Sequence, residues 1–244
     1  MSATTTTALE IGKIKEFIDK VEGWLSHKEG ELLYNLAKNC SGRGVIVEIG
    51  SWKGKSTIWL GKGSKKGESI KVYAVDPHIG FPDVIETYGK IWTYEGFKNN
   101  IKAAAVDDVV VSIVKTSEDA AGDFNEPVEL IFIDGVHQYD YVKLDFQLWF
   151  PKVIPGGTMA FHDTTGGYGA KQVVEELVYK SKHFKNVRFA DSITFAEKVE
   201  QNSFRDRLKN RYMLSLKHLY EFACKLHLPK PLKALGKKIL ALHR

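Results

Sequence analysis

The sequence predicts an α/β protein built around a doubly wound, mostly parallel seven-stranded sheet. Three observations carry this prediction. Short apolar runs alternate with amphipathic segments of helical periodicity through the middle of the chain, which is typical of strand–helix–strand units with parallel strands. A glycine-containing turn follows the first apolar run, at the position where such sheets usually bind a ligand. Two apolar runs lie close together at 187–199 and predict an antiparallel edge hairpin.

Five strands are expected to form the parallel part of the sheet, because each apolar run is short and a helical pattern follows it. The expected strands are 45–50, 70–76, 108–115, 128–134 and 157–163. The expected helices between and after them are 55–62, 95–104, 117–121, 138–149 and 169–181.

Two helices are expected before the sheet. The first carries apolar residues at helical spacing, namely Ile14, Phe17, Ile18, Val21 and Trp24. Ser26 and Glu29 have the spacing of a capping box, in which each side chain bonds the backbone of the other residue, so a second helix is expected to begin here. We expect these helices to flank the sheet or to contact a second subunit.

Length and composition favour one main domain with appendages. The chain has 244 residues, of which 43% are hydrophobic, enough for one sizeable core. We expect a helical segment at 1–40, the main domain at 41–200 and a basic tail at 201–244. The polar N-terminus predicts no signal peptide, and no run of eighteen apolar residues occurs, so a cytoplasmic location is expected. Cys40 and Cys224 show no metal-ligand spacing.

The tail differs from the rest of the chain in charge. Residues 201–244 hold eleven Lys and Arg against two acidic residues, whereas the remainder is net acidic. An acidic body argues against a nucleic-acid partner and suggests that the tail has a partner of its own. Its apolar stripe consists of Phe204, Leu208, Tyr212, Leu216, Leu219 and Ala223, before Pro229 and Pro231 end the helix. We expect this stripe to pack on the body or on a second subunit of a homo-oligomer; the alternative is peripheral contact with an anionic membrane at its inner face.

The turn in VIVEIGSWKGKST, residues 45–57, admits three kinds of ligand. A phosphate-binding loop needs four residues between its glycine and Gly-Lys-Ser/Thr, but only three separate Gly50 from Gly54. LIFID, residues 130–134, would supply the second motif of such an NTPase. A dinucleotide-binding turn would need glycine where Trp52 and Lys55 stand. Both patterns therefore fit poorly.

A third pattern fits without any change. Glu48, Gly50, Gly54 and Ser56, followed by an acid at the end of the next strand, Asp76, resemble the cofactor site of class I S-adenosylmethionine-dependent methyltransferases. The charged amino acid end of that cofactor needs hydrogen bonds from a turn and a helix N-terminus, and its ribose needs a carboxylate. Asp76 has a simpler alternative role, which is to cap the turn at Asp-Pro.

Further polar residues follow the fourth and fifth strands. Asp134 and His137 come after one strand, and His162 and Asp163 after the next. Because the carboxyl ends of parallel strands meet at one edge, these side chains should converge. Methyl transfer to oxygen needs an aligned acceptor and a base, so His137 could take the proton while a divalent cation on the acids lowers the acceptor pKa. Alternatively, His137 only caps a helix and His162 only forms a hydrogen bond near the cofactor.

Several segments together narrow the resemblance. VEIGSWKGKST, VYAVDP, VKTSED, FIDGVHQYD and LWFPKVIPGGTMAFHD are similar to the catechol-O-methyltransferase-like and macrocin-O-methyltransferase-like branch, of the methyltransferase domain family 24 type, over roughly 26–199. The resemblance implies a Rossmann-like methyltransferase fold and Mg²⁺ on Asp134, His162 and Asp163. His137 would be the general base, and Asp134 would be shared by the catalytic and cofactor sites.

The same resemblance implies cofactor contacts. Ser51 belongs to the turn around the methionine part, Trp52 matches an aromatic residue packed against that part, and Ser117, with Glu118 beside it, matches the adenine contact. One position departs from the sugar-modifying relatives, which have an acid where this chain has His162. A nitrogen ligand shifts the preference from Mg²⁺ toward softer metals, or leaves no metal.

The acceptor is less specified. The insertion 78–99 is expected to form a lid or a substrate wall, and the turn 164–168 lies on the same rim. The aromatic residues of the insertion are Phe81, Tyr88, Trp92, Tyr94 and Phe97. They suit contact with sugar rings or flat phenols; the alternative is that they only pack within the lid. We therefore expect an S-adenosylmethionine-dependent O-methyltransferase acting on a hydroxyl of a glycan or small molecule. The alternatives are a relative of the fold that binds the cofactor without methyl transfer, and an NTPase.

Overall fold

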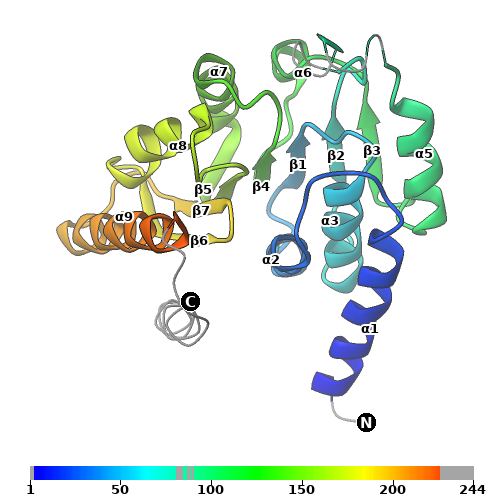
Figure 1. The fold of residues 1–244 in the computed structure, drawn as a ribbon, viewed down its shortest axis with the longest axis horizontal. Helices are drawn as coiled ribbons and strands as arrows, with labels where there is room; N and C mark the ends of the chain where they lie inside the picture. Colours follow the sequence, from blue (N-terminus) through cyan, green and yellow to red (C-terminus); the bar gives the residue numbers. More distant parts are fainter. Residues whose placement is uncertain (1–2, 81–84, 87–88, 90, 226–244) are drawn as a thin grey trace.

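The computed structural model describes residues 3–80, 85–86, 89 and 91–225. These residues form a seven-stranded sheet in the order β3-β2-β1-β4-β5-β7-β6 (Figure 1). The first five strands are parallel, and β7 is antiparallel to both of its neighbours. The predicted doubly wound sheet with an antiparallel edge hairpin is therefore confirmed.

Every predicted strand is present, with small changes at the ends. The strands are β1 Val45–Ile49, β2 Val72–Val75, β3 Val110–Ile113, β4 Val128–Ile133, β5 Val153–Phe161, β6 Phe184–Ala190 and β7 Ile193–Lys198. The largest difference is at β5, which begins four residues before the predicted 157. Val128 pairs with Val153 and Leu130 with Thr158, so the extra residues form an irregularity near the start of β5.

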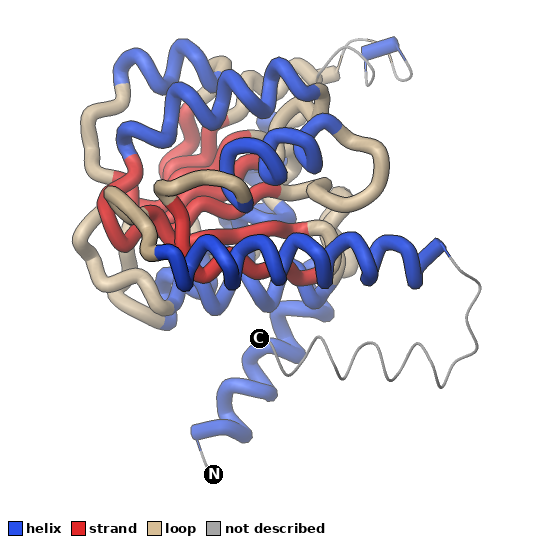
Figure 2. The backbone as a smooth tube through the Cα atoms, turned by 90° about the vertical axis from the view of Figure 1, so that its left-hand side faces the viewer, coloured by secondary structure: helices blue, strands red, loops and turns tan. Residues whose placement is uncertain are grey.

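Helices cover both faces of the sheet (Figure 2). They are α1 Ala3–Ile18, α2 His27–Lys38, α3 Lys55–Lys66, α5 Tyr94–Ala103, α6 Ser117–Asp123, α7 Tyr139–Trp149, α8 Gly169–Val174 and α9 Phe204–Lys225, with the short helices η1 Phe150–Lys152 and η2 Glu175–Tyr179. Alternate strand residues face opposite layers: Ile46 packs in the core beneath α1, α2, α3 and α5, and Val47 in the core beneath α6, α7 and α8. The predicted helix at 169–181 is split, because its second half, η2, is a π-helix.

Two glycines hold α2 unusually close to α3. A Cβ atom on Gly30 of α2 would lie 2.2 Å from the indole nitrogen of Trp59, and one on Gly63 of α3 would lie 2.2 Å from the carbonyl oxygen of Tyr34. The rings of Tyr34 and Trp59 meet edge to face, with centroids 6.5 Å apart. No larger residue fits at either glycine without moving a helix, so this contact determines where the N-terminus of α2 lies.

The helix α9 packs against the edge strand β6, but not with its apolar stripe. Its buried side includes Asn210, whose amide nitrogen donates to the Phe184 carbonyl at 2.9 Å. The predicted stripe faces outward instead, since Phe204 is 67% exposed and Leu219 is 62% exposed. The helix therefore packs on the body, as expected, but not through this apolar stripe. The physical reason is that an edge strand presents backbone polar groups, which an asparagine can satisfy and a leucine cannot.

Residues 226–244, with Pro229 and Pro231, lie outside the described residues. Within the described part of the chain, no helix combines the length and the apolarity that a bilayer crossing requires.

The α2–α3 contact predicts a strong effect of one methyl group. Gly63→Ala should lower the free energy of unfolding by about 1–3 kcal/mol, because the added carbon overlaps the Tyr34 carbonyl. Urea unfolding followed by circular dichroism measures this. Gly12→Ala in α1 is the matched control, since its added carbon meets nothing within 4 Å and should stabilise the helix by up to about 1 kcal/mol. Equal effects of the two substitutions would contradict the close contact.

Candidate active site

The site begins with four residues that follow the ends of four neighbouring strands. Ile49 of β1 is in register with Val75 of β2 and Ile133 of β4, and Ile133 is in register with Phe161 of β5. The residues that come next are Asp76, Gly50, Asp134 and His162, in that order across the sheet. These four residues therefore lie at one edge of the sheet, next to the point where the strand order reverses.

The β1–α3 loop is built on positive φ angles. Gly50 has φ +85°, and a Cβ atom there would lie 2.2 Å from the carbonyl oxygen of Asp134. Gly54, φ +88°, precedes α3 and offers no side-chain cap to its first N–H groups. Trp52 between them also has a positive φ, +47°, an unfavourable conformation for a bulky residue. The loop thus leaves a helix N-terminus open to an anionic group such as a carboxylate.

Asp76 holds this loop in place. One of its carboxylate oxygens accepts hydrogen bonds from the backbone N–H groups of Ser51 at 2.8 Å and Trp52 at 2.7 Å, and the other accepts from His78 at 2.7 Å. The alternative role predicted for Asp76, capping of the turn at Asp-Pro, is therefore confirmed. Asp76 also lines the cavity described below, so its contact with a ribose stays a prediction.

Glu48 lies behind the loop rather than in the cavity. It is fully buried, accepts a hydrogen bond from the Thr57 hydroxyl, and leaves its Oε1 atom without a partner among the described residues. Complete burial raises the pKa of Glu48 to about 8, although hydrogen bonds from Ser56 and Thr57 oppose the shift. Glu48 therefore fixes the first turn of α3, and direct contact with a cofactor stays a prediction.

A cavity of about 610 Å³ lies above these strand ends. Most of the predicted site residues line it: Gly50, Ser51, Trp52, Ser56, Asp76, Asp134, His137, His162 and Asp163. Glu48 and Ser117 do not. The Ser117 hydroxyl accepts a hydrogen bond from the Trp149 indole at 2.9 Å, at the start of α6, and its predicted adenine contact is not tested by this cavity.

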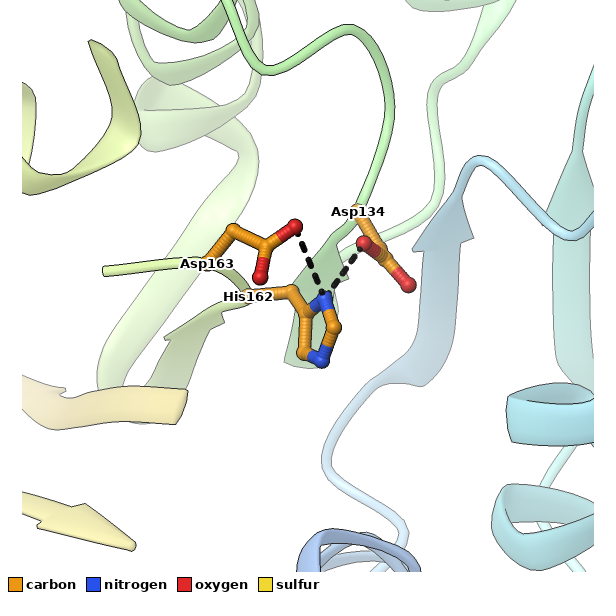
Figure 3. Close-up of side chains that lie close together, drawn as sticks. All are labelled: Asp134, His162 and Asp163. Atoms are coloured by element: carbon orange, nitrogen blue, oxygen red, sulfur yellow. Dashed lines mark ion pairs between the residues drawn. The ribbon is translucent and has the colours of Figure 1, made fainter. Parts of the chain in front are cut away.

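The centre of the site is a buried imidazole among carboxylates (Figure 3). His162 is only 6% exposed, and its Nδ1 atom lies 2.9 Å from an oxygen of Asp134 and 3.6 Å from one of Asp163. On the other side of the ring, Nε2 lies 3.6 Å from an oxygen of Glu29. Burial alone would lower the pKa of His162, but Asp134, Asp163 and Glu29 together raise it well above its usual range.

Glu29 is a site residue that the sequence did not reveal as one. The capping box with Ser26 is present as predicted, with a 2.9 Å bond from the Ser26 N–H. The other carboxylate oxygen accepts from the backbone N–H of Ser192 at 2.8 Å and from its hydroxyl at 2.6 Å. Burial would raise the pKa of Glu29, but its contacts with His162 and Ser192 lower it to about 2. Only the capping signal was visible in the sequence, because Ser192 lies 163 positions away.

Asp163 joins the two histidines. Its backbone has φ +51°, which residues other than glycine rarely adopt. Its Oδ2 atom lies 3.4 Å from Nδ1 of His137. The His137 ring packs against Tyr168, with ring centroids 5.6 Å apart. Gln138, and not His137, occupies the N-cap position of α7, and its side chain makes no cap hydrogen bond.

The N-terminal segment closes one wall of the cavity. Trp24 lies against Trp52 with ring centroids 5.6 Å apart. Lys55 donates to the Gly23 carbonyl at 3.1 Å, and Lys53 pairs with Glu22 at 2.5 Å. These two lysines attach the N-terminal segment to the loop.

The insertion 78–99 is described in part. Phe81 and Tyr88 lie outside the described residues, and Phe97 is buried in the core, so it packs rather than lines a surface. Trp92 is 54% exposed and, with Trp24 and Trp52, lines a second hollow of about 370 Å³ beside the first. Part of the predicted aromatic wall is thus present.

Comparisons with known proteins agree with this architecture. A profile of the family described as a methyltransferase domain matches residues 47–164. An uncharacterised protein of Sinorhizobium fredii is 29% identical over 142 residues, which are 54% of this chain and only 15% of that protein.

Several solved structures share the fold. The O-methyltransferase NovP matches with a TM-score of 0.60 and 18% identity over 72% of this chain and 81% of its own. TomG, an O-methyltransferase from Streptomyces achromogenes in complex with S-adenosylmethionine, matches with a TM-score of 0.54 and 16% identity over 78% and 88%. The Bacillus cereus O-methyltransferase in complex with S-adenosylhomocysteine gives 0.53 and 17% over 79% and 91%.

At these identities, the structural likeness demonstrates the fold, while the family match covers the loop and strand ends that build the site. The chain is therefore similar to this methyltransferase-domain family over 47–164, a little under half of its length, and it has the fold of the solved O-methyltransferases.

Proposed function

We propose that this protein is an S-adenosylmethionine-dependent methyltransferase that acts on a hydroxyl oxygen of a small molecule or glycan, with His137 as the general base. The observation that carries the proposal is the pairing of His137 with Asp163 at 3.4 Å on the wall of the cavity that also holds the cofactor loop. A carboxylate beside one ring nitrogen orients an imidazole and stabilises it once it is protonated.

The cofactor would lie between the loop and the strand ends. The open N-terminus of α3 and the N–H groups near Ser56 suit its carboxylate. The acids that line the cavity, Glu22, Glu29, Asp76, Asp134 and Asp163, favour a cationic sulfonium. The same charges disfavour a phosphate-rich acceptor, which agrees with the expectation of no nucleic-acid partner.

The reaction needs little from the protein beyond alignment and proton removal. The acceptor oxygen forms a bond to the methyl carbon while the carbon–sulfur bond breaks and its electron pair stays on sulfur. The products are S-adenosylhomocysteine and a methyl ether. The hydroxyl proton passes to His137, and Asp163 supports the resulting imidazolium.

A divalent cation is part of the proposal. One ligand atom from each of Asp134, His162 and Asp163 lies within 4.8 Å of the others. Both ring nitrogens of His162 are buried without an aligned hydrogen-bond partner among the described residues, which supports metal ligation by the neutral imidazole. Two carboxylates and an imidazole suit Mn²⁺ or a similar ion better than Mg²⁺. A bound ion would lower the pKa of a coordinated acceptor hydroxyl.

The acceptor would lie against aromatic walls. Trp24 and Tyr168 line the main cavity, and Trp92 lines the adjoining hollow. Flat aromatic faces favour a ring, either a sugar or a phenol. The structure therefore supports an acceptor that carries a ring, and both a sugar and a phenol meet this condition.

We expect variants of the proposed catalytic residues to keep cofactor binding while they lose methyl transfer. Calorimetry should detect binding of S-adenosylhomocysteine and none of ATP. His137→Ala should keep that binding but reduce methyl transfer about 10²- to 10⁴-fold, because it removes the base. Asp134→Asn should also bind and lose turnover.

His183→Ala is the matched control, because this exposed histidine lies outside the cavity and its loss should leave turnover unchanged. Binding of ATP alone would overturn the proposed cofactor. Full activity of His137→Ala would overturn only the assignment of the base.

The metal site predicts a change of ion preference. In protein stripped with a chelator, the wild-type chain should bind Mn²⁺ more tightly than Mg²⁺, and His162→Asp should shift the ratio toward Mg²⁺ by about tenfold, because an oxygen replaces a nitrogen ligand. Calorimetry with each ion measures both affinities. Asp134→Asn should weaken both ions. A wild-type chain that binds neither ion would contradict the metal proposal.

Glu29 is predicted to act as a positioning residue for His162. Glu29→Gln should lower kcat about 10- to 100-fold with little change in the KM for S-adenosylmethionine, because the charge beside the imidazole is lost while the size is kept. Glu31→Gln, on the same helix but paired with Lys15 at the surface, should leave both constants unchanged. An equal rise in KM would show that Glu29 serves cofactor binding instead.

A further inference from the structure

A row of large apolar side chains runs along the outer side of α9. Phe204, Leu208, Tyr212, Leu219 and Phe222 are each 50% to 67% exposed. With about 100° between successive residues of an α-helix, they fall within an arc of about 80°. We call these five residues the α9 stripe. A soluble protein rarely leaves so continuous an apolar row uncovered, so the stripe indicates a contact surface.

The opposite side of α9 is held firmly on the body. Lys217 and Asn210 are fully buried, and Glu221 forms an ion pair with Lys171 of α8. His218 lies 2.8 Å from Glu175 of η2. Tyr220 packs on Phe189 of β6, with ring centroids 5.7 Å apart. Rotating the helix to bury the stripe would break these contacts, so the stripe stays outward.

Basic residues border the stripe on both sides. On an α-helix, Arg211 falls along one border, and Arg205 and Lys209 along the other. All three are exposed. Beyond them the tail continues to be basic, with eleven Lys and Arg against two acids over 201–244.

From this arrangement we infer that α9 lies on an anionic membrane surface. The stripe enters the boundary between headgroups and acyl chains, and the flanking cations meet anionic headgroups. A second copy of the chain is disfavoured as the occupant, because packing stripe against stripe brings Arg205, Lys209 and Arg211 of both copies together. The charge pattern therefore selects a partner that is both apolar and anionic.

The placement of α9 connects this surface with the catalytic cavity. Its C-terminal half is tied to α8 through Glu221 and Lys171. Helix α8 begins directly after Tyr168, which lines the cavity. Helix α8 therefore links α9 to one rim of the cavity.

The test is sedimentation of the full chain with vesicles of phosphatidylcholine alone or mixed with an equal part of phosphatidylglycerol. The wild-type chain should sediment with the mixed vesicles only, and added salt should weaken this binding. The double variant Leu208→Ser/Leu219→Ser should bind the mixed vesicles at least about tenfold more weakly than the wild type, because it removes apolar contact. Leu9→Ser is the matched control, since Leu9 is an equally exposed leucine, 59%, on α1.

Thermal unfolding checks that each variant remains folded, and binding of S-adenosylhomocysteine checks that the cavity is intact. Equal sedimentation of the wild type and the double variant would overturn the inference. A wild-type dimer in analytical ultracentrifugation that the double variant abolishes, without vesicle binding, would assign the stripe to a second copy. Neither outcome depends on methyl transfer, so this inference and the proposed function fail separately.

Discussion

The site depends on one electrostatic arrangement, the approach of Glu29, Asp134 and Asp163 to the buried imidazole of His162. Three carboxylates so close together in a partly buried place would repel one another strongly without a positive charge between them. A protonated imidazole or a bound cation would supply that charge. Each acid comes from a different part of the chain: Glu29 from α2, Asp134 from the segment after β4 and Asp163 from the segment after β5. The cluster therefore links the N-terminal segment to the sheet as well as forming the wall of the cavity.

Packing between α2 and α3 makes this arrangement possible. Gly30 follows Glu29 directly and lies against Trp59 without room for a side chain. A wider spacing between the helices would carry the Glu29 carboxylate away from both Ser192 and His162. A core contact between two helices thus helps to set the geometry of the cavity, whose other lining residues lie mainly in loops after the strand ends and in the N-terminal segment.

Most of the sheet and part of the site could be predicted from the sequence, because their signals are local. Apolar runs and turn glycines define the strands, and strand register alone brings Asp76, Asp134 and His162 to one edge. The role of Glu29 could not be predicted, since it depends on a turn 163 positions away. The burial of Glu48 under the loop is likewise a result of tertiary packing. Periodicity identified the apolar stripe of α9 but not the direction it faces, because Asn210 and the backbone of β6 decide that.

The polar contact between α9 and β6 determines what removal of the tail would do to the sheet. β6 is the last strand of the sheet, and α9 covers it, with Asn210 bonded to the Phe184 carbonyl. Deleting the helix would bare the outer edge of that strand, and uncovered strand edges pair readily with other chains. A truncated chain would thus gain a tendency to aggregate at the same time as it lost the stripe. Its sedimentation behaviour would mix two effects, whereas point substitutions on the outer side of α9 leave the edge protected.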